Sequence, residues 1–395
     1  MQLAEPGTIA LFLLTAGSLV VIAVVSSQMT RRLALPFTLV FLLLGMLAGS
    51  EGVGGIVFTD YRLAFQFGTV ALVLILFDGG LNTPMETVRR VLAPAGILAT
   101  VGVAATAALV AVAARLGGFG WPQAALLGAV VSSTDAAAVF GVLRGGGLRL
   151  RPRIGTTLEI ESGINDPAAI ILTIAITTLL AAPEAHPAWM LPFDVVIQAA
   201  VGAIVGWGIG IVGRRGLAML RLSSSGLYPA VTIGLAFISF GLATVLNGSG
   251  FLATYLAGLI LGNGRLPYRP ALTRVHDATA WLSQISMFLL FGLLVTPSDL
   301  PGVAVVGTLI AVALALVIRP LVVWLCLLPF HYNMVEIGFM GWVGLRGAVP
   351  IVLAIFPVLA GAPGAEHVFD AVFFLVVVNA IIPGSTVGWL ARKLG

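Results

Sequence analysis

The sequence predicts an all-α polytopic membrane protein with about 13 transmembrane helices. Of its 395 residues, 59% are hydrophobic and only 9% are charged, whereas about a quarter of the residues of a soluble protein are charged. A helix needs about 20 apolar residues to cross the hydrocarbon layer, so the chain has room for about a dozen spans joined by short loops. These proportions exclude a soluble fold of this size.

Apolar runs bounded by glycine, proline and charged clusters mark the expected spans. The first run is expected to be retained as a helix, because no basic residue precedes it as in a cleaved signal peptide. The whole chain is expected to form a single transmembrane domain. In chain order the runs cover residues 9–25, 35–49, 63–79, 94–114, 121–143, 155–181, 192–212, 227–246, 251–261, 278–295, 301–328, 334–359 and 369–390.

The basic residues predict which helix ends face the cytoplasm, because cytoplasmic loops carry the excess of Lys and Arg. With the N-terminus outside, Arg62 and Arg115 fall in outer loops, and Arg319 and Arg346 fall within spans. The other 16 of the 20 basic residues fall on the inner side: Arg31, Arg32, Arg89, Arg90, Arg144, Arg149, Arg151, Arg153, Arg214, Arg215, Arg221, Arg265, Arg269, Arg274, Arg392 and Lys393. The C-terminus is therefore expected in the cytoplasm. The net charge of +4 then reflects topology and requires no nucleic-acid partner.

An odd number of spans also allows two inverted six-helix repeats, because an offset of seven helices turns one copy over. The fifth helix (121–143) and the twelfth helix (334–359) would then be partners. Both contain residues that break helices near their middle, Ser132-Ser133-Thr134-Asp135 in the fifth and Gly344 to Pro350 in the twelfth. Crossed, broken helices in corresponding positions of two inverted halves are typical of the binding site of a transporter.

Ionisable residues within membrane spans are costly and usually line an interior cavity. Asp166 lies about 15 Å along the sixth helix, near the middle of the bilayer. The carboxylates, hydroxyls and amide around it suit a hard cation. All four histidines are expected in loops, so a transition-metal site is disfavoured, and no cofactor is expected. The ionisable residues in the spans are Asp78, Asp135, Glu159, Glu161, Asp166, Arg319 and Arg346, and the nearby uncharged candidates are Thr134, Ser162 and Asn165.

Three motifs resemble those of one protein family. Glu161-Ser162-Gly163-Ile164-Asn165-Asp166, together with Ser133-Thr134-Asp135, resembles the paired signature of the monovalent cation/proton antiporter superfamily, specifically its NhaP-like bacterial branch, which is related to the sodium/proton exchangers. The Gly344 to Ala348 stretch resembles the third family motif, and residues 149–168 are similar to the potassium/proton members. The resemblance extends over essentially the whole chain. It implies a multi-pass protein of the bacterial inner membrane that exchanges K⁺ or Na⁺ for H⁺.

The resemblance also implies an assembly and a cation site. The expected assembly is a homodimer in membrane lipid, in which a core domain moves against a dimerisation domain. The cation site would comprise Asp166, Ser162, the Thr134 to Asp135 segment, and Asp78 as the acidic residue of the third helix.

Two further features follow from the resemblance. Glu161 and Arg346 would form a structural ion pair. Potassium/proton members often continue into a cytoplasmic regulatory domain, which this chain, ending just after Arg392-Lys393, is expected to lack.

The residues themselves leave several roles open. Asp135 either ligates the ion or balances the N-terminus of the inner half of the fifth helix, and the second role is favoured. Asn165 cannot change its charge, so it is expected to fix the broken segment by hydrogen bonds. Thr134 and Ser162 either ligate the cation or join helices. Asp78 either belongs to the site or lines an inner funnel.

The expected mechanism is competition between a cation and a proton for Asp166. Because Asn165 stands where a second carboxylate could titrate, the exchange is expected to be electroneutral, with one proton for each cation. An enzyme is not expected: the G-x-G-D sequence of an intramembrane aspartyl protease is absent, and Ser249 lacks an intramembrane histidine that could activate it. A cation channel is the alternative, although no carbonyl-lined filter is recognisable. The choice between K⁺ and Na⁺ depends on cavity size and stays open.

Overall fold

The computed structural model of the chain describes residues 7–33, 36–145, 148, 150–181, 184, 187–220 and 222–394. Within these ranges the protein is helical apart from short connections and one β-bridge between Gly49 and Ile56. This confirms the predicted all-α class. Among the described residues, nine helices are long and apolar enough to cross a membrane, and three apolar helices are shorter. The exact count of 13 spans therefore stays a prediction.

The helices follow one another with short connections. Two π-helical segments, η1 and η3, continue directly into the neighbouring α-helices. In chain order the elements are α1 (Gly7–Leu33), α2 (Phe37–Ala48), α3 (Tyr61–Asn82), α4 (Met85–Ile97), η1 (Leu98–Gly102), α5 (Val103–Leu116), α6 (Trp121–Val130), α7 (Ala136–Gly145), α8 (Pro152–Ala181), η2 (Ala188–Met190), α9 (Leu191–Met219), α10 (Leu227–Val245), α11 (Gly250–Gly262), α12 (Arg269–Leu294), α13 (Pro301–Ala313), η3 (Leu314–Ile318), α14 (Arg319–Leu327), η4 (Leu328–Phe330), α15 (Met334–Trp342), α16 (Val349–Leu359) and α17 (Ala365–Leu394).

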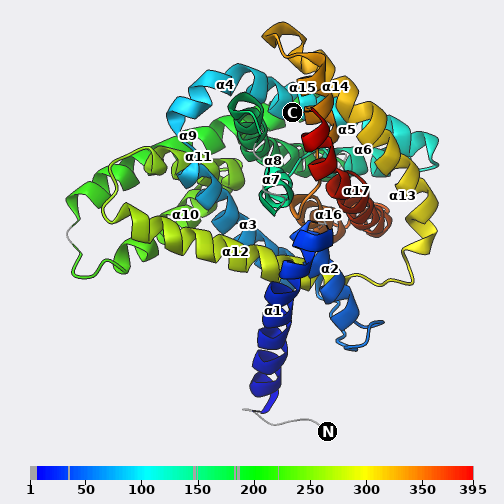
Figure 1. Cartoon of the computed structure of the whole chain (residues 1–395), viewed down its shortest axis with the longest axis horizontal. Coiled ribbons are helices and arrows are strands. Elements are labelled where there is room, and N and C mark those ends of the chain that lie inside the picture. The colour runs from blue at the N-terminus through cyan, green and yellow to red at the C-terminus, as the bar shows by residue number, and fades with distance from the viewer. Residues whose placement is uncertain are drawn as a thin grey trace.

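The helices form two groups with α7 and α8 between them (Figure 1). In one group, α3 and α9 pack on α11, and α3 also packs on α12. In the other group, α5 packs on α6, and α17 packs on α13 and α16. Helix α1 projects away from the rest of the molecule (Figure 1), and its apolar side chains are largely exposed.

Glycine allows the backbones of the packed helices to approach closely. A Cβ atom placed on Gly258 or Gly262 of α11 would collide with the backbone of α3 at Phe77 and Leu81. Small residues at helix contacts are the usual means of close packing within a membrane. The high glycine content of the chain, 48 of 395 residues, is therefore used in part at this contact.

Both predicted helix breaks are confirmed. The fifth span is divided between α6 and α7 by residues 131–135, and the twelfth between α15 and α16 by residues 343–348. At the first break the Ser132 hydroxyl donates to the carbonyl of Ala129 at 2.6 Å, which is the competition with helix bonding expected of serine. At the second break Pro350 stands in the first turn of α16, where its missing N–H costs nothing.

Several predicted boundaries were wrong, and two helix starts differ most. The fourth helix starts at Met85 rather than at residue 94, and the tenth starts at Arg269 rather than at residue 278. The apolar run marks only the part of a helix that faces apolar surroundings. The helix itself continues through polar turns, and the Glu86–Arg90 ion pair lies in such a turn of α4.

The earlier start of α12 also corrects the expectation that all four histidines lie in loops. His276 is buried within α12, and its Nε2 lies 2.7 Å from the Thr232 hydroxyl of α10. His331 does lie in a turn, whereas His367 lies in α17. His186 is outside the described residues.

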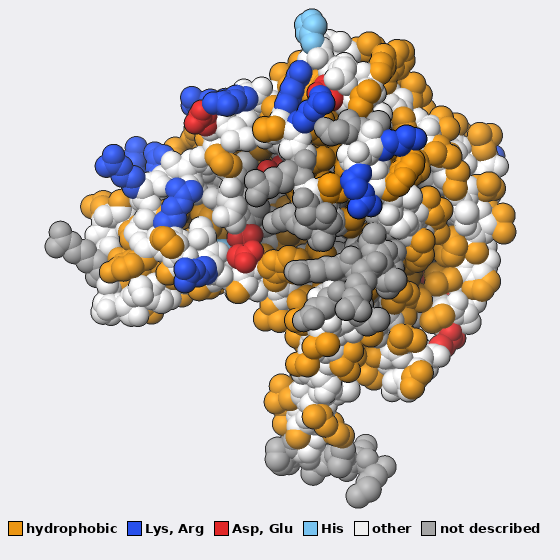
Figure 2. Space-filling view, viewed as in Figure 1, with side chains coloured by type: hydrophobic (Ala, Val, Ile, Leu, Met, Phe, Trp, Pro, Cys, Tyr) orange, Lys and Arg blue, Asp and Glu red, His pale blue; other side chains and the backbone are white. Residues whose placement is uncertain are grey.

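Lys and Arg side chains outnumber Asp and Glu side chains on the face shown in Figure 2. An excess of basic residues on the cytoplasmic side is what the positive-inside rule predicts. Of the counted arginines, Arg149 and Arg221 lie outside the described residues, and the side chains of Arg31, Arg32 and Arg144 are not described. The orientation of the two termini stays a prediction.

Candidate functional site

Helix α8 carries half of the predicted site residues, Glu161, Ser162, Asn165 and Asp166, and lies at the centre of the molecule (Figure 1). Ser162, Asn165 and Asp166 are separated by three and four positions, so they share one face of this helix. That face meets the break between α6 and α7, and α8 also packs against α15 and α16. The sequence-distant motifs are therefore brought together by the packing of α8 between the two broken helices.

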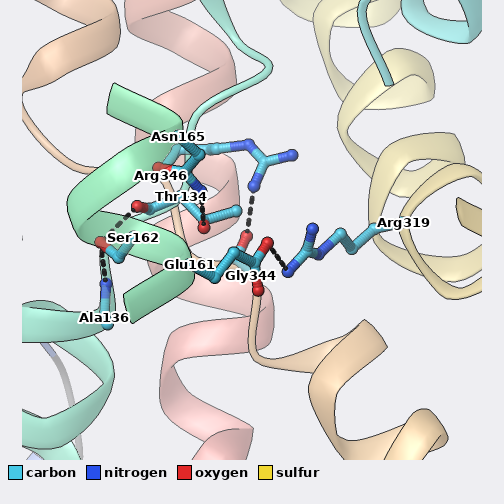
Figure 3. Close-up of polar contacts among 8 residues, drawn as sticks. All are labelled: Thr134, Ala136, Glu161, Ser162, Asn165, Arg319, Gly344 and Arg346. Atoms are coloured by element: carbon cyan, nitrogen blue, oxygen red, sulfur yellow. Dashed lines mark hydrogen bonds and ion pairs between the residues drawn. The ribbon is translucent and has the colours of Figure 1, made fainter. Parts of the chain in front are cut away.

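Hydrogen bonds fix the first break to α8 (Figure 3). The Ser162 hydroxyl donates to the carbonyl of Thr134 at 2.8 Å and accepts from the backbone N–H of Ala136 at 3.1 Å. The Asn165 side-chain amide donates to the Thr134 hydroxyl at 2.6 Å. This is a hydrogen bond of the kind expected for Asn165, whose role in fixing the broken segment stays a prediction. Ser162 and Thr134 both join helices here, and their role as cation ligands stays a prediction.

Asp135 lies at the start of α7. Its carboxylate accepts from the backbone N–H of Ala138 at 3.0 Å, which is the contact of a capping residue with a helix N-terminus. The negative charge of Asp135 is therefore placed against the positive end of α7. This is the position expected if Asp135 balances the helix N-terminus. Its own N–H donates to the carbonyl of Leu345 at 2.7 Å, so the two broken segments are joined directly.

Asp166 is the other carboxylate at this break. It lies beside the Ser133 hydroxyl and interacts electrostatically with Asp135. Both aspartates are half-buried, whereas Asn165 is 1% exposed and the whole Ser132 to Thr134 segment is buried. A carboxylate that retains exposure among buried neighbours can exchange protons or ions with water. Ser133 was not among the predicted site residues, although it belongs to the Ser133-Thr134-Asp135 motif.

The second break is held by Arg346 and by a residue that sequence reasoning missed. The backbone N–H of Arg346 donates to the Asn379 side chain of α17 at 3.2 Å, and its guanidinium donates to the carbonyl of Gly344 at 3.0 Å. Asn379 is 2% exposed. An amide between the apolar stretches 371–378 and 380–384 was the available signal, because buried polar groups in a membrane need a partner.

The predicted ion pair between Glu161 and Arg346 was wrong in its partner. Glu161 pairs with Arg319 of α14, with a distance of 2.6 Å between Oε1 and Nη2, and both side chains are at most 4% exposed (Figure 3). Arg346 is also buried and interacts electrostatically with both residues. The physical reason is that Arg346 turns its guanidinium to the carbonyl of Gly344 at its own helix break, whereas Arg319, the first residue of α14 directly after the π-helical segment η3, extends to Glu161.

Asp78 is the one predicted site residue that the structure places elsewhere. Its carboxylate accepts from the Asn82 amide at 2.7 Å and interacts electrostatically with Asp277 of α12. These contacts suit the inner-funnel alternative. A direct ligand role for Asp78 stays a prediction.

Gly347 makes the approach of the second break to Asp135 possible. A Cβ atom at this position would collide with the Asp135 carboxylate. We expect Gly347→Ala to reduce cation/proton exchange by about tenfold or more, because a shift of the carboxylate by about 1 Å costs binding geometry. Exchange is measured in proteoliposomes.

Gly338→Ala is the matched control for Gly347→Ala. Gly338 lies in α15, the other half of the same broken helix, and a Cβ atom there meets nothing within 4 Å. Equal exchange rates for the two variants would contradict the proposed importance of the Gly347 contact.

The fold and this site define a class of protein: a polytopic membrane protein in which two half-buried aspartates lie where a central helix meets a broken helix. The model of the transmembrane sodium/hydrogen exchanger family matches residues 18–393. The chain belongs to the sodium/hydrogen exchanger family.

Curated relatives match almost the whole chain. It is 45% identical over 390 residues to the K⁺/H⁺ antiporter NhaP of Alkalimonas amylolytica, which covers 97% of this chain and 67% of that protein. It is 43% identical over 385 residues to the K⁺/H⁺ antiporter NhaP2 of Shewanella oneidensis, which covers 96% of this chain and 66% of the relative. The chain thus spans about two thirds of the length of these relatives. The predicted resemblance is confirmed.

A solved structure shares the fold. The sodium proton antiporter MjNhaP1 of Methanocaldococcus jannaschii, solved at pH 8, aligns with a TM-score of 0.84 over 98% of this chain and 99% of the other, at 22% sequence identity. At this identity the likeness establishes the architecture.

Proposed function

We propose that this protein is a secondary active antiporter that exchanges K⁺ or Na⁺ for H⁺ across the membrane. The observation that carries the proposal is the position of Asp166, which lies half-buried beside Ser133 and Asp135 where α8 meets the break between α6 and α7. Membership of the exchanger family and the potassium/proton relatives support it. They disfavour the alternative of a cation channel.

The proposed mechanism is competition for the Asp166 carboxylate. A cation is held by the Asp166 oxygens and by hydroxyl or carbonyl oxygens of Thr134 and Ser162, because oxygen ligands replace the hydration shell of a hard cation. A proton on the same carboxylate removes its charge and releases the cation. Asp135 stays ionised at the N-terminus of α7, and Asn165 holds the broken segment in place.

Alternating access in this proposal uses the two groups of helices as two domains. The group that contains α5, α6, α13, α16 and α17 belongs with α7 and α8 to a core domain, and the group around α3, α9, α11 and α12 belongs to a dimerisation domain. The proposed assembly is a homodimer in the lipid of a bacterial inner membrane. The largely exposed apolar side chains of α1 and α9 suit such an environment.

The decisive experiment measures exchange in proteoliposomes. K⁺, Na⁺ and Li⁺ are compared side by side at a fixed pH gradient, and dissipation of the gradient is followed with a pH-sensitive dye. Saturable exchange with K⁺ or Na⁺ supports the proposal. A unitary current in a planar bilayer, without coupled proton movement, would contradict it.

Electroneutral exchange is a further expected result. If Asp166 is the one group that exchanges its proton, one H⁺ leaves for each cation bound, and the cycle moves no net charge. The equilibrium end point should therefore not respond to membrane voltage, whereas net movement of one charge would be worth about 2.3 kcal/mol per 100 mV.

The voltage measurement uses the sodium mode, or an ionophore that is not selective for the transported ion, so that setting the potential does not disturb the substrate gradient. The end point is compared at zero and at a large negative potential, with the same pH gradient. A shifted end point would show that a second group, such as Asp135, also releases a proton.

A further inference from the structure

Three buried threonines in the half of the molecule beyond Asp166 lack hydrogen-bond partners. Thr173 and Thr177 of α8 are fully buried, Thr106 of α5 is 1% exposed, and none of the three hydroxyls has a partner among the described residues. A threonine in a helix normally satisfies its hydroxyl on the carbonyl four residues earlier. On α8, Thr157 and Thr178 do so, with Arg153 and Ile174, but Thr173 and Thr177 do not.

The spacing of these threonines connects them to Asp166. Positions seven and eleven residues beyond Asp166 return to its face of the helix, and these positions are Thr173 and Thr177. At a rise of about 1.5 Å per residue they lie about 10 and 16 Å from Asp166 towards the Ala181 end of α8. Their hydroxyls therefore form a line that starts at the proposed carrier.

Thr106 belongs to the same level of the molecule. Val91 and Ala95 of α4 pack in one cluster with Ile160 of α8. In the predicted topology, the α4–η1–α5 helix and α8 run through the membrane in the same direction. Thr106 lies about three turns beyond Ala95, which places it near the level of Thr173.

Two of the helices that pack on α8, namely α6 and α16, offer these hydroxyls almost no polar side chain. Helix α16 contains no polar side chain, and the only polar side chain of α6 is Gln123, near its outer end. In α8 the residues beyond Asp166 are apolar apart from Thr173, Thr177 and Thr178. An unsatisfied hydroxyl in so apolar a setting is unfavourable unless water or an ion reaches it.

We infer that Thr173, Thr177 and Thr106 line the path by which the cation travels between Asp166 and the Ala181 end of α8. Along this path, each hydroxyl in turn replaces part of the hydration shell of the cation. The inference rests on the proposed antiport at Asp166. It assigns to these residues a role in the rate of ion passage, distinct from the binding of the ion at the carboxylate.

Isosteric substitutions test the inference. Thr173→Val and Thr177→Val remove only the hydroxyl, and each should slow K⁺/H⁺ or Na⁺/H⁺ exchange by about tenfold, the effect of losing one contact to a charged group. Stabilisation of the purified protein by K⁺ or Na⁺ against heat should be unchanged, because Asp166 is intact. Wild-type exchange rates in both variants would overturn the inference.

Thr178→Val is the matched control, because the Thr178 hydroxyl already donates to the carbonyl of Ile174 at 2.9 Å. It should exchange at the wild-type rate. A loss as large as that of Thr173→Val would overturn the inference, since it would show a general sensitivity of this helix. Absence of exchange in the wild-type protein would instead overturn the proposed function.

Thiol labelling provides a test that does not depend on exchange. The wild-type chain has one cysteine, the buried Cys326, so Thr173→Cys can be compared with the unmodified protein in vesicles of either orientation. A small, impermeant cationic thiol reagent should react from the side of the Ala181 end, and K⁺ should slow the reaction. No reaction from that side would overturn the inference.

Discussion

Asp166→Asn is expected to abolish cation/proton exchange in both directions while leaving a folded protein. The amide is nearly the same size as the carboxylate and can keep a contact with Ser133, but it cannot take up or release a proton. Exchange is measured in proteoliposomes under both gradient directions, and folding is assessed by size-exclusion chromatography and thermal unfolding.

A second aspartate variant makes this result specific. Asp194→Asn removes a carboxylate from the first turn of α9, outside the proposed site, and should retain exchange. If Asp166→Asn still exchanges at more than about a tenth of the wild-type rate, the assignment is contradicted, because an amide neither takes up nor releases a proton near neutral pH.

Loss of the Glu161–Arg319 ion pair is expected to give the largest loss of stability. Glu161→Gln leaves Arg319 and Arg346 as two buried guanidinium groups without a counter-ion. Removing one partner of a buried pair typically costs about 3–5 kcal/mol in the free energy of unfolding. The measurement is thermal unfolding of the purified protein in detergent, for the single variants Glu161→Gln and Arg319→Gln and for the double variant.

The double-mutant cycle identifies the partner. If Glu161 pairs with Arg319, the loss in the Glu161→Gln, Arg319→Gln double variant is smaller than the sum of the single losses, because each partner is already unpaired in the other single variant. The same cycle with Arg346→Gln should show weaker coupling. Stronger coupling to Arg346 than to Arg319 would contradict the geometry of the structure.

An exposed ion pair provides the control for these stability measurements. Glu86 and Arg90 pair on the surface of α4 with their side chains 79% and 75% exposed. Exposed pairs contribute about 0–1 kcal/mol, so Glu86→Gln should leave the unfolding temperature almost unchanged. A large loss here would show that the assay responds to any change of charge.

Much of the site could be predicted because its parts are local in sequence. Ser132 to Asp135 and Gly344 to Pro350 carry their helix-breaking chemistry within a few residues, and both breaks were found where expected. Ser162, Asn165 and Asp166 share a helix face by spacing alone. Their convergence on the first break followed from the motif resemblance, and Ser162 and Asn165 reach that break through hydrogen bonds to Thr134 and Ala136.

Contacts between distant helices could not be predicted in this way. Arg319 lies 158 positions from Glu161 in the sequence, and no local pattern distinguishes it from Arg346 as a partner. Asn379 reaches the second break from another helix. The helix starts at Met85 and Arg269 were missed because these helices begin with polar turns. Hydropathy detects only the apolar part of a helix.

By itself, the sequence determined the all-helical membrane class, the family, the two helix breaks and the carboxylates that accompany them, because composition, spacing and backbone preference act over short stretches. The packing of the helices decided which arginine neutralises Glu161, that Asp78 interacts electrostatically with Asp277, and that the Asp135 carboxylate approaches Gly347 closely. These are matters of which surfaces meet when the helices pack, and in a dry interior each buried charge takes the partner that packing brings within reach.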